Sequence, residues 1–409
     1  MKCRNCQGTN LTRFLDLGTA PLSNGYLTEA QLSEVEVWIP LRVMICSDCW
    51  LAQTEDFITR EDVFTSEYAY FSSMSQSWLE HAAKYVDQVV ERFELDETSF
   101  VIEVASNDGY LLRPFVDRGI PCLGIEPTAS TAAAAREKGV ETVEEFLSMN
   151  TAAEIIARYG KADLVVANNV LAHVPNIVDF AQALASLLKP GGVLTVEFPR
   201  LTTLIDQSQF DTVYHEHFSY LSLHSAISVF ESAGLEIFDV EEINTHGGSL
   251  RVFGQLISQK TKTKSKAVDL LLRFEADRGV RTLDYYSRIQ PDAELVKLRL
   301  LRTLIDLKQR HEAIAAYGAA AKGNTLLNFA GIRADLLPYV VDRSPSKIGM
   351  YLPGSRIPVL EVAELGKRKP GTILILPWNL HAEVAQQLAY ASDWGAKLIV
   401  INGKSEHGQ

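Results

Sequence analysis

The chain has 409 residues and a formal net charge of −12 at pH 7, with 47% hydrophobic and 22% charged residues. This composition is typical of a globular protein rather than a disordered one, and the length calls for two or three domains. The acidic balance argues against duplex nucleic acid as a partner, because little positive charge is left to offset its phosphates. The sequence shows neither a signal peptide nor an apolar stretch of the roughly 18 residues that a membrane helix needs. We therefore expect a cytoplasmic protein without membrane or nucleic-acid partners.

Residues 1–65 are rich in turns and carry two pairs of cysteines. Two residues separate the partners within each pair, Cys3 with Cys6 and Cys46 with Cys49. In a reducing compartment such pairs are better metal ligands than disulfides, and two pairs fill the tetrahedral shell of one Zn²⁺. Four thiolates leave no position for water, so the zinc is expected to be structural. We predict a zinc-binding module, with a hairpin or small sheet between the two pairs.

Residues 66–257 alternate between short apolar runs and helix-like segments. The β-branched runs are 100–106, 121–127, 162–169 and 191–199, and the segments between them include 128–139 and 178–192. Strands that alternate with helices predict parallel βαβ units in a doubly wound sheet. Two later runs, 235–244 and 247–256, lie close together, as antiparallel edge strands of that sheet would.

Glu103, Ala105 and Gly109 lie at the turn after the first of these strands, and a helix is expected to begin near Tyr110. This turn resembles that of class I S-adenosylmethionine-dependent methyltransferases. Those enzymes place an acidic residue and small residues here, so that backbone amides reach the methionyl part of the cofactor. The next strand ends at Glu126, where an acid can bind both ribose hydroxyls. The chain has no G-x-G-x-x-G motif for NAD, and an ordinary turn with a solvated Glu126 is the alternative.

The same fold places further residues around the cofactor. The third strand of the unit should end near the adenine, and the fourth should end beside the reactive sulfonium. The predicted cofactor-binding residues are Glu103, Ala105, Asn107, Gly109, Glu126, Phe146, Asn168 and Asn169.

Residues 258–409 form a third block. A lysine-rich stretch at 258–269 indicates a surface boundary, and a long amphipathic helix that is expected to end near Tyr317 follows it. A second, smaller α/β unit then begins with a glycine-rich turn at 317–324. Such a turn offers backbone amides and a lysine charge to a phosphate, although it could be purely structural. We predict that a nucleotide diphosphate lies between the two α/β units, in contact with Gly318, Lys322 and Asn324.

The segment Tyr214-His215-Glu216-His217 gathers two imidazoles, a carboxylate and a phenol. Histidine titrates near neutral pH and is therefore the natural general base. Methyl transfer to carbon needs a carbanion, which such a base forms by removing a hydrogen next to a ketone if the enolate oxygen is stabilised. The histidines lack the i, i+4 spacing of a zinc-binding helix. Either histidine could instead fill or cap the core.

Six motifs spread over the three blocks carry a resemblance to a known family. They are C-R-x-C at the start, the pair Cys46 and Cys49, E-x-x-S-N-D-G at 103–109, NNVLAHV at 168–174, YHEHFSYLS at 214–222 and GGSLRV at 247–252. Together they are similar to the zinc-containing, S-adenosylmethionine-dependent sugar C-methyltransferases, which make branched deoxysugars from nucleotide-linked 4-keto-hexoses. The best-known members methylate C3 of thymidine-diphosphate (dTDP) sugars.

The resemblance implies an α/β fold in three parts. These are an N-terminal zinc-binding module (1–65), a central class I methyltransferase Rossmann-like domain (66–257) and a second Rossmann-like domain that binds the nucleotide sugar (258–409). It also implies that His217 deprotonates the carbon next to the ketone, while Tyr214 and Glu216 orient it or stabilise the enolate. His173, on a helix expected after Asn169, is another active-site residue that the resemblance implies. Tyr68 is favoured over Tyr70 as the family's active-site tyrosine, and Tyr70 and His215 are expected to contact the substrate.

Two alternatives remain open at this point. An O- or N-methyltransferase acting on a related sugar would need a base but no enolate stabiliser. A zinc-ribbon protein with an inactive methyltransferase fold would be a binding protein and would need neither. The sequence does not fix the sugar, the nucleotide, methylation at C3 or C5, or the oligomeric state.

Overall fold

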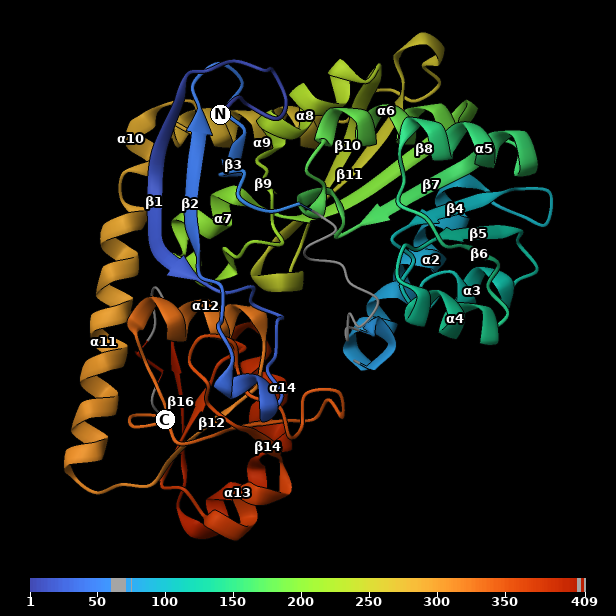
Figure 1. The fold of residues 1–409 in the computed structure, drawn as a ribbon. Helices are drawn as coiled ribbons and strands as arrows, with labels where there is room; N and C mark the ends of the chain where they lie inside the picture. Colours follow the sequence, from blue (N-terminus) through green and yellow to red (C-terminus); the bar gives the residue numbers. More distant parts are fainter. Residues whose placement is uncertain (60–70, 75, 403–405, 408–409) are drawn as a thin grey trace.

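The computed structural model describes residues 1–59, 71–74, 76–402 and 406–407, which build three sheets (Figure 1). Tyr68 and Tyr70 lie outside the described residues. Within these ranges, none of the helices is both long enough and apolar enough to span a membrane.

The first sheet is antiparallel, in the order β1-β2-β3-β9. Alternate apolar residues of its two long strands, such as Leu15 and Val43, are buried on one face, which confirms the hairpin expected between the cysteine pairs. The last strand comes from the segment just after His217, so the central part of the chain completes this sheet. The strands are β1 (Leu11–Ala20), β2 (Ile39–Cys46), β3 (Ala52–Thr54) and β9 (Ser219–Tyr220).

The second sheet has the order β10-β11-β8-β7-β4-β5-β6, in which β4 to β8 are parallel and β10 and β11 form an antiparallel edge, as predicted. Its strands are β4 (Val101–Val104), β5 (Cys122–Ile125), β6 (Thr142–Val143), β7 (Ala162–Asn168), β8 (Leu188–Pro199), β10 (Leu235–Ile243) and β11 (Ser249–Leu256). The helices of this part are α2 (Gln76–Phe93), α3 (Arg113–Val116), α4 (Ala129–Glu137), α5 (Met149–Tyr159), α6 (Ile177–Leu187), α7 (Leu201–Asp206), α8 (Leu223–Ser232) and α9 (Lys266–Asp277).

The third sheet has the order β14-β13-β12-β15-β16-β17, parallel except for its last strand. Its strands are β12 (Ile314–Tyr317), β13 (Val340–Asp342), β14 (Val359–Glu361), β15 (Thr372–Ile375), β16 (Lys397–Ile401) and β17 (Glu406–His407). The helices that precede and accompany it are α10 (Leu283–Tyr286), α11 (Ile289–Gln309), α12 (Ala321–Ala330), α13 (Ala363–Arg368) and α14 (His381–Gln387).

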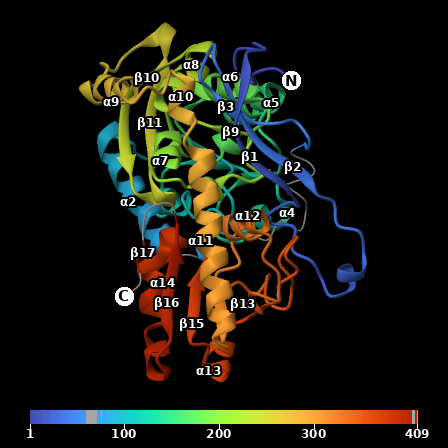
Figure 2. The ribbon, with the colours of Figure 1, turned by 90° about the vertical axis from the view of Figure 1, so that its left-hand side faces the viewer.

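The long helix α11 joins the first and third sheets (Figure 2). Its buried residues Val296, Leu300 and Leu304 belong to one hydrophobic cluster with Leu15 of the first sheet and Leu374 of the third. A second cluster includes three of the four paired cysteines together with the helices and strands of the central sheet. The N-terminal part therefore shares its cores with the other two parts of the chain.

Two helix boundaries differ from the expected ones. The helix expected near Tyr110 begins only at Arg113 and is four residues long. Ala105, Asn107 and Gly109 all have positive φ, so the chain forms turns here instead of a helix. The helix expected to end near Tyr317 ends at Gln309. Residues 314–317 are fully apolar in character and form the buried strand β12 between β13 and β15 instead.

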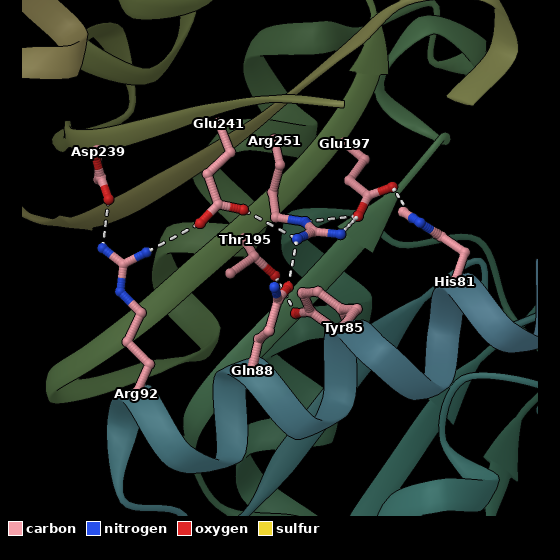
Figure 3. Close-up of polar contacts among 9 residues, drawn as sticks. All are labelled: His81, Tyr85, Gln88, Arg92, Thr195, Glu197, Asp239, Glu241 and Arg251. Atoms are coloured by element: carbon pink, nitrogen blue, oxygen red, sulfur yellow. Dashed lines mark hydrogen bonds and ion pairs between the residues drawn. The ribbon is translucent and has the colours of Figure 1, made fainter. Parts of the chain in front are cut away.

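A buried ion pair fastens α2 to the central sheet (Figure 3). Nη2 of Arg251 lies 2.6 Å from Oε1 of Glu197, with the two side chains 4% and 0% exposed. Nε2 of His81, on α2, lies 3.1 Å from the other oxygen of Glu197. Burial alone would raise the pKa of Glu197, but the hydrogen bond to His81 and the charge of Arg251 lower it. Tyr85 of α2 adds a hydrogen bond of 2.5 Å to Thr195 of β8.

We expect Arg251→Met to destabilise the protein by about 3–5 kcal/mol, because it leaves the Glu197 carboxylate buried beside His81 alone. Arg92→Gln is the matched control, since Arg92 pairs with Asp239 at a more exposed site and should cost no more than about 1 kcal/mol. Urea unfolding followed by fluorescence measures both. Equal midpoints for the two variants would contradict this account of the ion pair.

Candidate functional site

The carboxyl ends of β4 and β5 hold the predicted cofactor turn. The backbone amide of Asn107 donates to Oε2 of Glu126 at 2.9 Å, and the amide of Thr128 donates to Oε1 at 2.9 Å. The acid is therefore held by both oxygens at the end of its strand. A side chain at Gly109 would place its Cβ 2.9 Å from Cγ2 of Val140, so this position of the turn requires glycine. Burial raises the pKa of Glu126.

Buried polar atoms gather beside this turn. Glu103 is 1% exposed, and burial followed by the charges of nearby carboxylates raises its pKa well above the usual range. Within the described part of the chain, Oε2 of Glu103, Oδ1 of Asn168 and both amide atoms of Asn169 are buried without a hydrogen-bond partner. Buried polar groups normally have partners. The set therefore fits a polar ligand such as the amino-acid end of S-adenosylmethionine, with Phe146 half-buried near the end of β6.

The segment before α2 is tied to the same turn. The amide of Ser72 donates to Oδ1 of Asn107 at 2.9 Å. Nζ of Lys138 lies 2.8 Å from Oδ2 of the buried Asp108, which also accepts a hydrogen bond from Ser73. Sequence reasoning missed Asp108 and Lys138, because only the fold brings them together. The expected tyrosines, Tyr68 and Tyr70, belong to the stretch just before this anchored segment and outside the described residues.

His217 has a defined hydrogen-bond geometry. Its Nδ1 lies 3.0 Å from the carbonyl oxygen of Thr212, and a carbonyl can only accept, so Nδ1 carries the proton. In the neutral ring, Nε2 then has the lone pair. The ring of Tyr214 lies 4.0 Å from the His217 ring, centroid to centroid, and the ring of His173 lies 4.6 Å from it. The structure thus brings together three of the predicted active-site side chains.

The protonation state and the position of His173 both distinguish it from a second general base beside His217. Burial lowers its pKa to about 4, so the ring is neutral at pH 7. It lies in a short 3₁₀ turn, Leu171–His173, rather than on the helix expected after Asn169. Asn169 directly follows β7, which ends at Asn168, and has a positive φ of 56°, a conformation that asparagine tolerates and that turns the chain before an α-helix can form.

The other two members of the YHEH segment point elsewhere. Nε2 of His215 lies 3.3 and 3.2 Å from the carbonyl oxygens of Ile39 and Pro40, so its contacts hold the start of β2. Oε1 of Glu216 accepts a hydrogen bond of 2.6 Å from the side-chain amide of Asn24. These contacts run to the N-terminal part of the chain, and sequence reasoning could not have found Asn24. The substrate role of His215 and the orienting role of Glu216 stay predictions.

The glycine turn of the third sheet meets the central part beside this segment. Nζ of Lys322 donates to Oδ1 of Asn379 at 2.6 Å and lies 4.6 Å from the ring centre of Trp378. Burial lowers the pKa of Lys322 to about 8. Nε1 of Trp378 donates to Oδ2 of Asp211 at 2.7 Å, and burial raises the pKa of this carboxyl to about 6. Asp211 and Trp378 also line a cavity of about 270 Å³.

The structure gives the other two predicted residues of that turn a reason for their identity. Gly318 has a φ of 94°, and a Cβ there would lie 2.4 Å from Cδ of Pro377, so no side chain fits. The side-chain amide of Asn324 donates to the carbonyl oxygen of Ser23 at 2.7 Å, and this bond joins α12 to the N-terminal part. Contact of Gly318, Lys322 and Asn324 with a nucleotide stays a prediction.

The four paired cysteines form one cluster, with all four sulfur atoms within 4.8 Å of one another. Cys3 and Cys49 are 3.4 Å apart, and Cys6 and Cys46 are 3.6 Å apart, sulfur to sulfur. A tetrahedral shell with Zn–S bonds of about 2.3 Å separates its sulfurs by about 3.8 Å. The hydrogen bond between Cys3 and Cys49 raises the pKa of Cys3 and lowers that of Cys49 to about 5. The geometry fits one Zn²⁺, whose charge would allow all four thiols to ionise.

We expect purified protein to contain one Zn²⁺ per chain, and Cys46→Ser to lose it. Because these cysteines share a core with the central sheet and metal binding is coupled to folding, the loss should also lower the unfolding temperature. Cys122→Ser, outside the cluster, is the control. Metal analysis and thermal unfolding measure both effects, and full zinc content in Cys46→Ser would contradict the assignment.

Three family models match successive parts of the chain. The first is described as a zinc binding domain and matches residues 3–64. The second is a methyltransferase domain and matches residues 78–240. The third is a C-methyltransferase C-terminal domain and matches residues 244–401.

C-methyltransferase NovU from Streptomyces niveus is 32% identical to this chain over 399 residues, which cover 98% of this chain and 94% of that protein. Ubiquinone biosynthesis O-methyltransferase from Bradyrhizobium sp. (strain ORS 278) is 28% identical over 155 residues, which cover 32% of this chain and 60% of that protein. The solved structure of magnesium protoporphyrin IX methyltransferase (ChlM) from Synechocystis PCC 6803 gives a TM-score of 0.35 at 17% identity, over 43% of this chain and 82% of that chain. Since the similarity to NovU runs through nearly all of both proteins, the chain belongs to the family of S-adenosylmethionine-dependent C-methyltransferases that carry an N-terminal zinc-binding domain.

Proposed function

We propose that this cytoplasmic C-methyltransferase methylates a nucleotide-diphospho 4-keto-deoxysugar, at C3 of a dTDP-linked sugar, in the biosynthesis of branched sugars. The observation that carries the proposal is the environment of His217. Its Nδ1 is bound to the carbonyl of Thr212, so the ring offers Nε2 to a proton beside Tyr214 and His173. A carbon acid next to a ketone is the substrate that such a base suits.

The cofactor is proposed to lie across the ends of β4 and β5. Glu126 would accept hydrogen bonds from the ribose hydroxyls, because a carboxylate offers about four acceptor positions and the two backbone amides occupy two of them. The buried carboxylate oxygen of Glu103 would face the amino-acid end, and the buried polar atoms of Asn168 and Asn169 would lie beside the sulfonium. S-adenosylmethionine, when bound, supplies the electrophilic methyl group. The remaining residues of this set, Ala105, Asn107, Gly109 and Phe146, would shape the turn and the adenine pocket.

The proton step is proposed to use His217 as the base. When Nε2 takes the proton, the ring becomes an imidazolium, and the Thr212 carbonyl stabilises it through the Nδ1 hydrogen bond. The neighbouring ring of His173 stays neutral at pH 7, since burial lowers its pKa to about 4, and so it does not repel the new charge. Tyr214 is proposed to orient the base or to stabilise the enolate, and Tyr68 is proposed for the same site.

The substrate is proposed to bridge the central and third sheets. The hydroxyl of Thr325, on α12, donates to the carbonyl oxygen of Val213 at 2.9 Å, so the turn of the third sheet lies next to the segment that carries His217. A diphosphate bound at that turn would thus leave its sugar near the base. The residues proposed for the substrate are Gly318, Lys322, Asn324, Tyr70 and His215, and Glu216 is proposed to orient His217 or to stabilise the enolate.

We expect Glu126→Ala to weaken binding of S-adenosylmethionine by about 1–3 kcal/mol, the scale of hydrogen bonds made by a charged group. Glu154→Ala, on the exposed face of α5, is the control and should bind as the parent does. Titration calorimetry measures the affinity of each variant. Unchanged affinity in Glu126→Ala would place the ribose elsewhere.

We expect His217→Asn to bind both ligands but to reduce turnover by about 100-fold or more, the usual effect of losing a general base. With S-adenosylhomocysteine bound, the parent should exchange the hydrogen next to the ketone with deuterated water, and His217→Asn should not. His311→Asn, an exposed histidine, is the control. Exchange at the parent rate in His217→Asn would show that another group is the base, and methyl on oxygen or nitrogen would refute the proposed carbon acceptor.

A further inference from the structure

The central and third sheets use one parallel plan. In the central sheet the parallel strands run β6-β5-β4-β7-β8, and in the third sheet they run β14-β13-β12-β15-β16. In both, the first strand of the unit leads through a turn into a helix, and the second strand lies beside the first. In such folds a ligand binds outside the carboxyl ends of the strands, with an acid at the end of the second strand on its ribose.

The second strand of the third sheet also ends in an acid, and its hydrogen bonds match those of Glu126. Glu126 accepts the amide of Thr128, two residues on, at 2.9 Å and the turn amide of Asn107 at 2.9 Å. Asp342 accepts the amide of Ser344, two residues on, at 2.8 Å and the turn amide of Ala319 at 2.6 Å. The two carboxylates therefore have the same place in the plan and the same pair of backbone donors, one on each oxygen.

This arrangement leaves acceptor capacity for a ligand. A carboxylate offers about four lone-pair positions, and the two backbone amides use two of them. Asp342 is half-buried, so its outer face meets solvent. A carboxylate held in this way suits a hydroxyl donor such as that of a pentose, because its orientation is already fixed before binding.

The residues around Asp342 connect it to the methyl-transfer site. The hydroxyl of Tyr26 donates to the carbonyl oxygen of Ala319 at 2.5 Å, and Nζ of Lys347 donates to the same oxygen at 2.8 Å. Nζ of Lys347 also lies 5.2 Å from the centre of the Tyr26 ring. Asn24, two residues before Tyr26, donates from its side-chain amide to Oε1 of Glu216 at 2.6 Å, so this part of the chain links the turn of the third sheet to the YHEH segment.

We propose that Asp342 binds a pentose hydroxyl of the nucleoside diphosphate that carries the sugar substrate, with Lys347 as a cation for its phosphates in addition to Lys322. This inference rests on the proposed function, since it places the nucleoside at one end and the sugar near His217 at the other. The chain would then hold two nucleosides with two equivalent acids, the cofactor on Glu126 and the substrate on Asp342.

Two isosteric variants test the inference, because each should weaken the binding of one nucleoside ligand and leave the other unchanged. Asp342→Asn should weaken binding of dTDP by roughly 10- to 100-fold, the range expected when a charged hydrogen-bond acceptor is lost, and should leave S-adenosylhomocysteine affinity unchanged. Glu126→Gln should do the reverse. Calorimetry with dTDP and S-adenosylhomocysteine on the full chain measures all four affinities, and ADP serves as a probe of base preference.

Parent-like binding of dTDP by Asp342→Asn, or failure of the parent to bind dTDP, would overturn the inference. So would a loss of dTDP affinity in Glu126→Gln, because it would place both nucleosides on one acid. If Asp342→Asn folds poorly, Lys347→Gln decides, since it should weaken dTDP binding more than thymidine binding. These assays need no turnover, so a product methylated elsewhere would refute the proposed reaction and leave the pentose assignment standing.

Discussion

One hydrogen bond decides what the His217 segment can do. The carbonyl of Thr212 accepts from Nδ1 of His217 at 3.0 Å, and this selects the tautomer in which Nε2 can receive a proton. The bond spans only five residues, so it depends on the shape of the loop between them. Two other parts of the chain hold that loop. The hydroxyl of Thr54, in the first sheet, donates to the carbonyl oxygen of His217 at 3.3 Å, and that of Thr325, on α12, donates to Val213 at 2.9 Å.

The first sheet also connects the cysteine cluster to the loop that carries His217. Cys49 is followed after two residues by β3, and Ala52 of β3 pairs with Tyr220 of β9, three residues after His217. A structural metal bound by the four cysteines would therefore help to fix the loop that carries His217 without contacting it. The shared cores point the same way, because α11 joins the first and third sheets in one hydrophobic cluster. The His217 segment belongs to the central part of the chain, and residues of the first sheet and of α12 hold it in place.

The features that sequence could predict are those with a local cause. The four cysteines were predictable because two residues between the partners suffices to bring two thiolates to one metal, and the strands were predictable from short apolar runs. The two wrong helix boundaries have local causes that the hydrophobic pattern does not show. The positive φ of Ala105, Asn107 and Gly109 delays α3, and the apolar residues 314–317 fit a buried strand as well as a helix.

Contacts between distant residues could not be predicted. Asn24 meets Glu216 across the chain, and Trp378 meets Asp211 in the same way. The spacing of YHEH suggested one cluster of four side chains, but the backbone sends His215 to the start of β2. Asp342 lacks any motif in the sequence, and only its two backbone donors show its likeness to Glu126.

The most direct test of the account is the tautomer of His217. Nitrogen-15 NMR distinguishes a protonated ring nitrogen from an unprotonated one, and a spectrum of His217→Asn assigns the signal among the nine histidines. The account predicts that, at pH values where the ring is neutral, Nδ1 carries the proton and Nε2 does not. A ring protonated at Nε2 would mean that the Thr212 carbonyl does not hold Nδ1, and it would contradict the role proposed for His217.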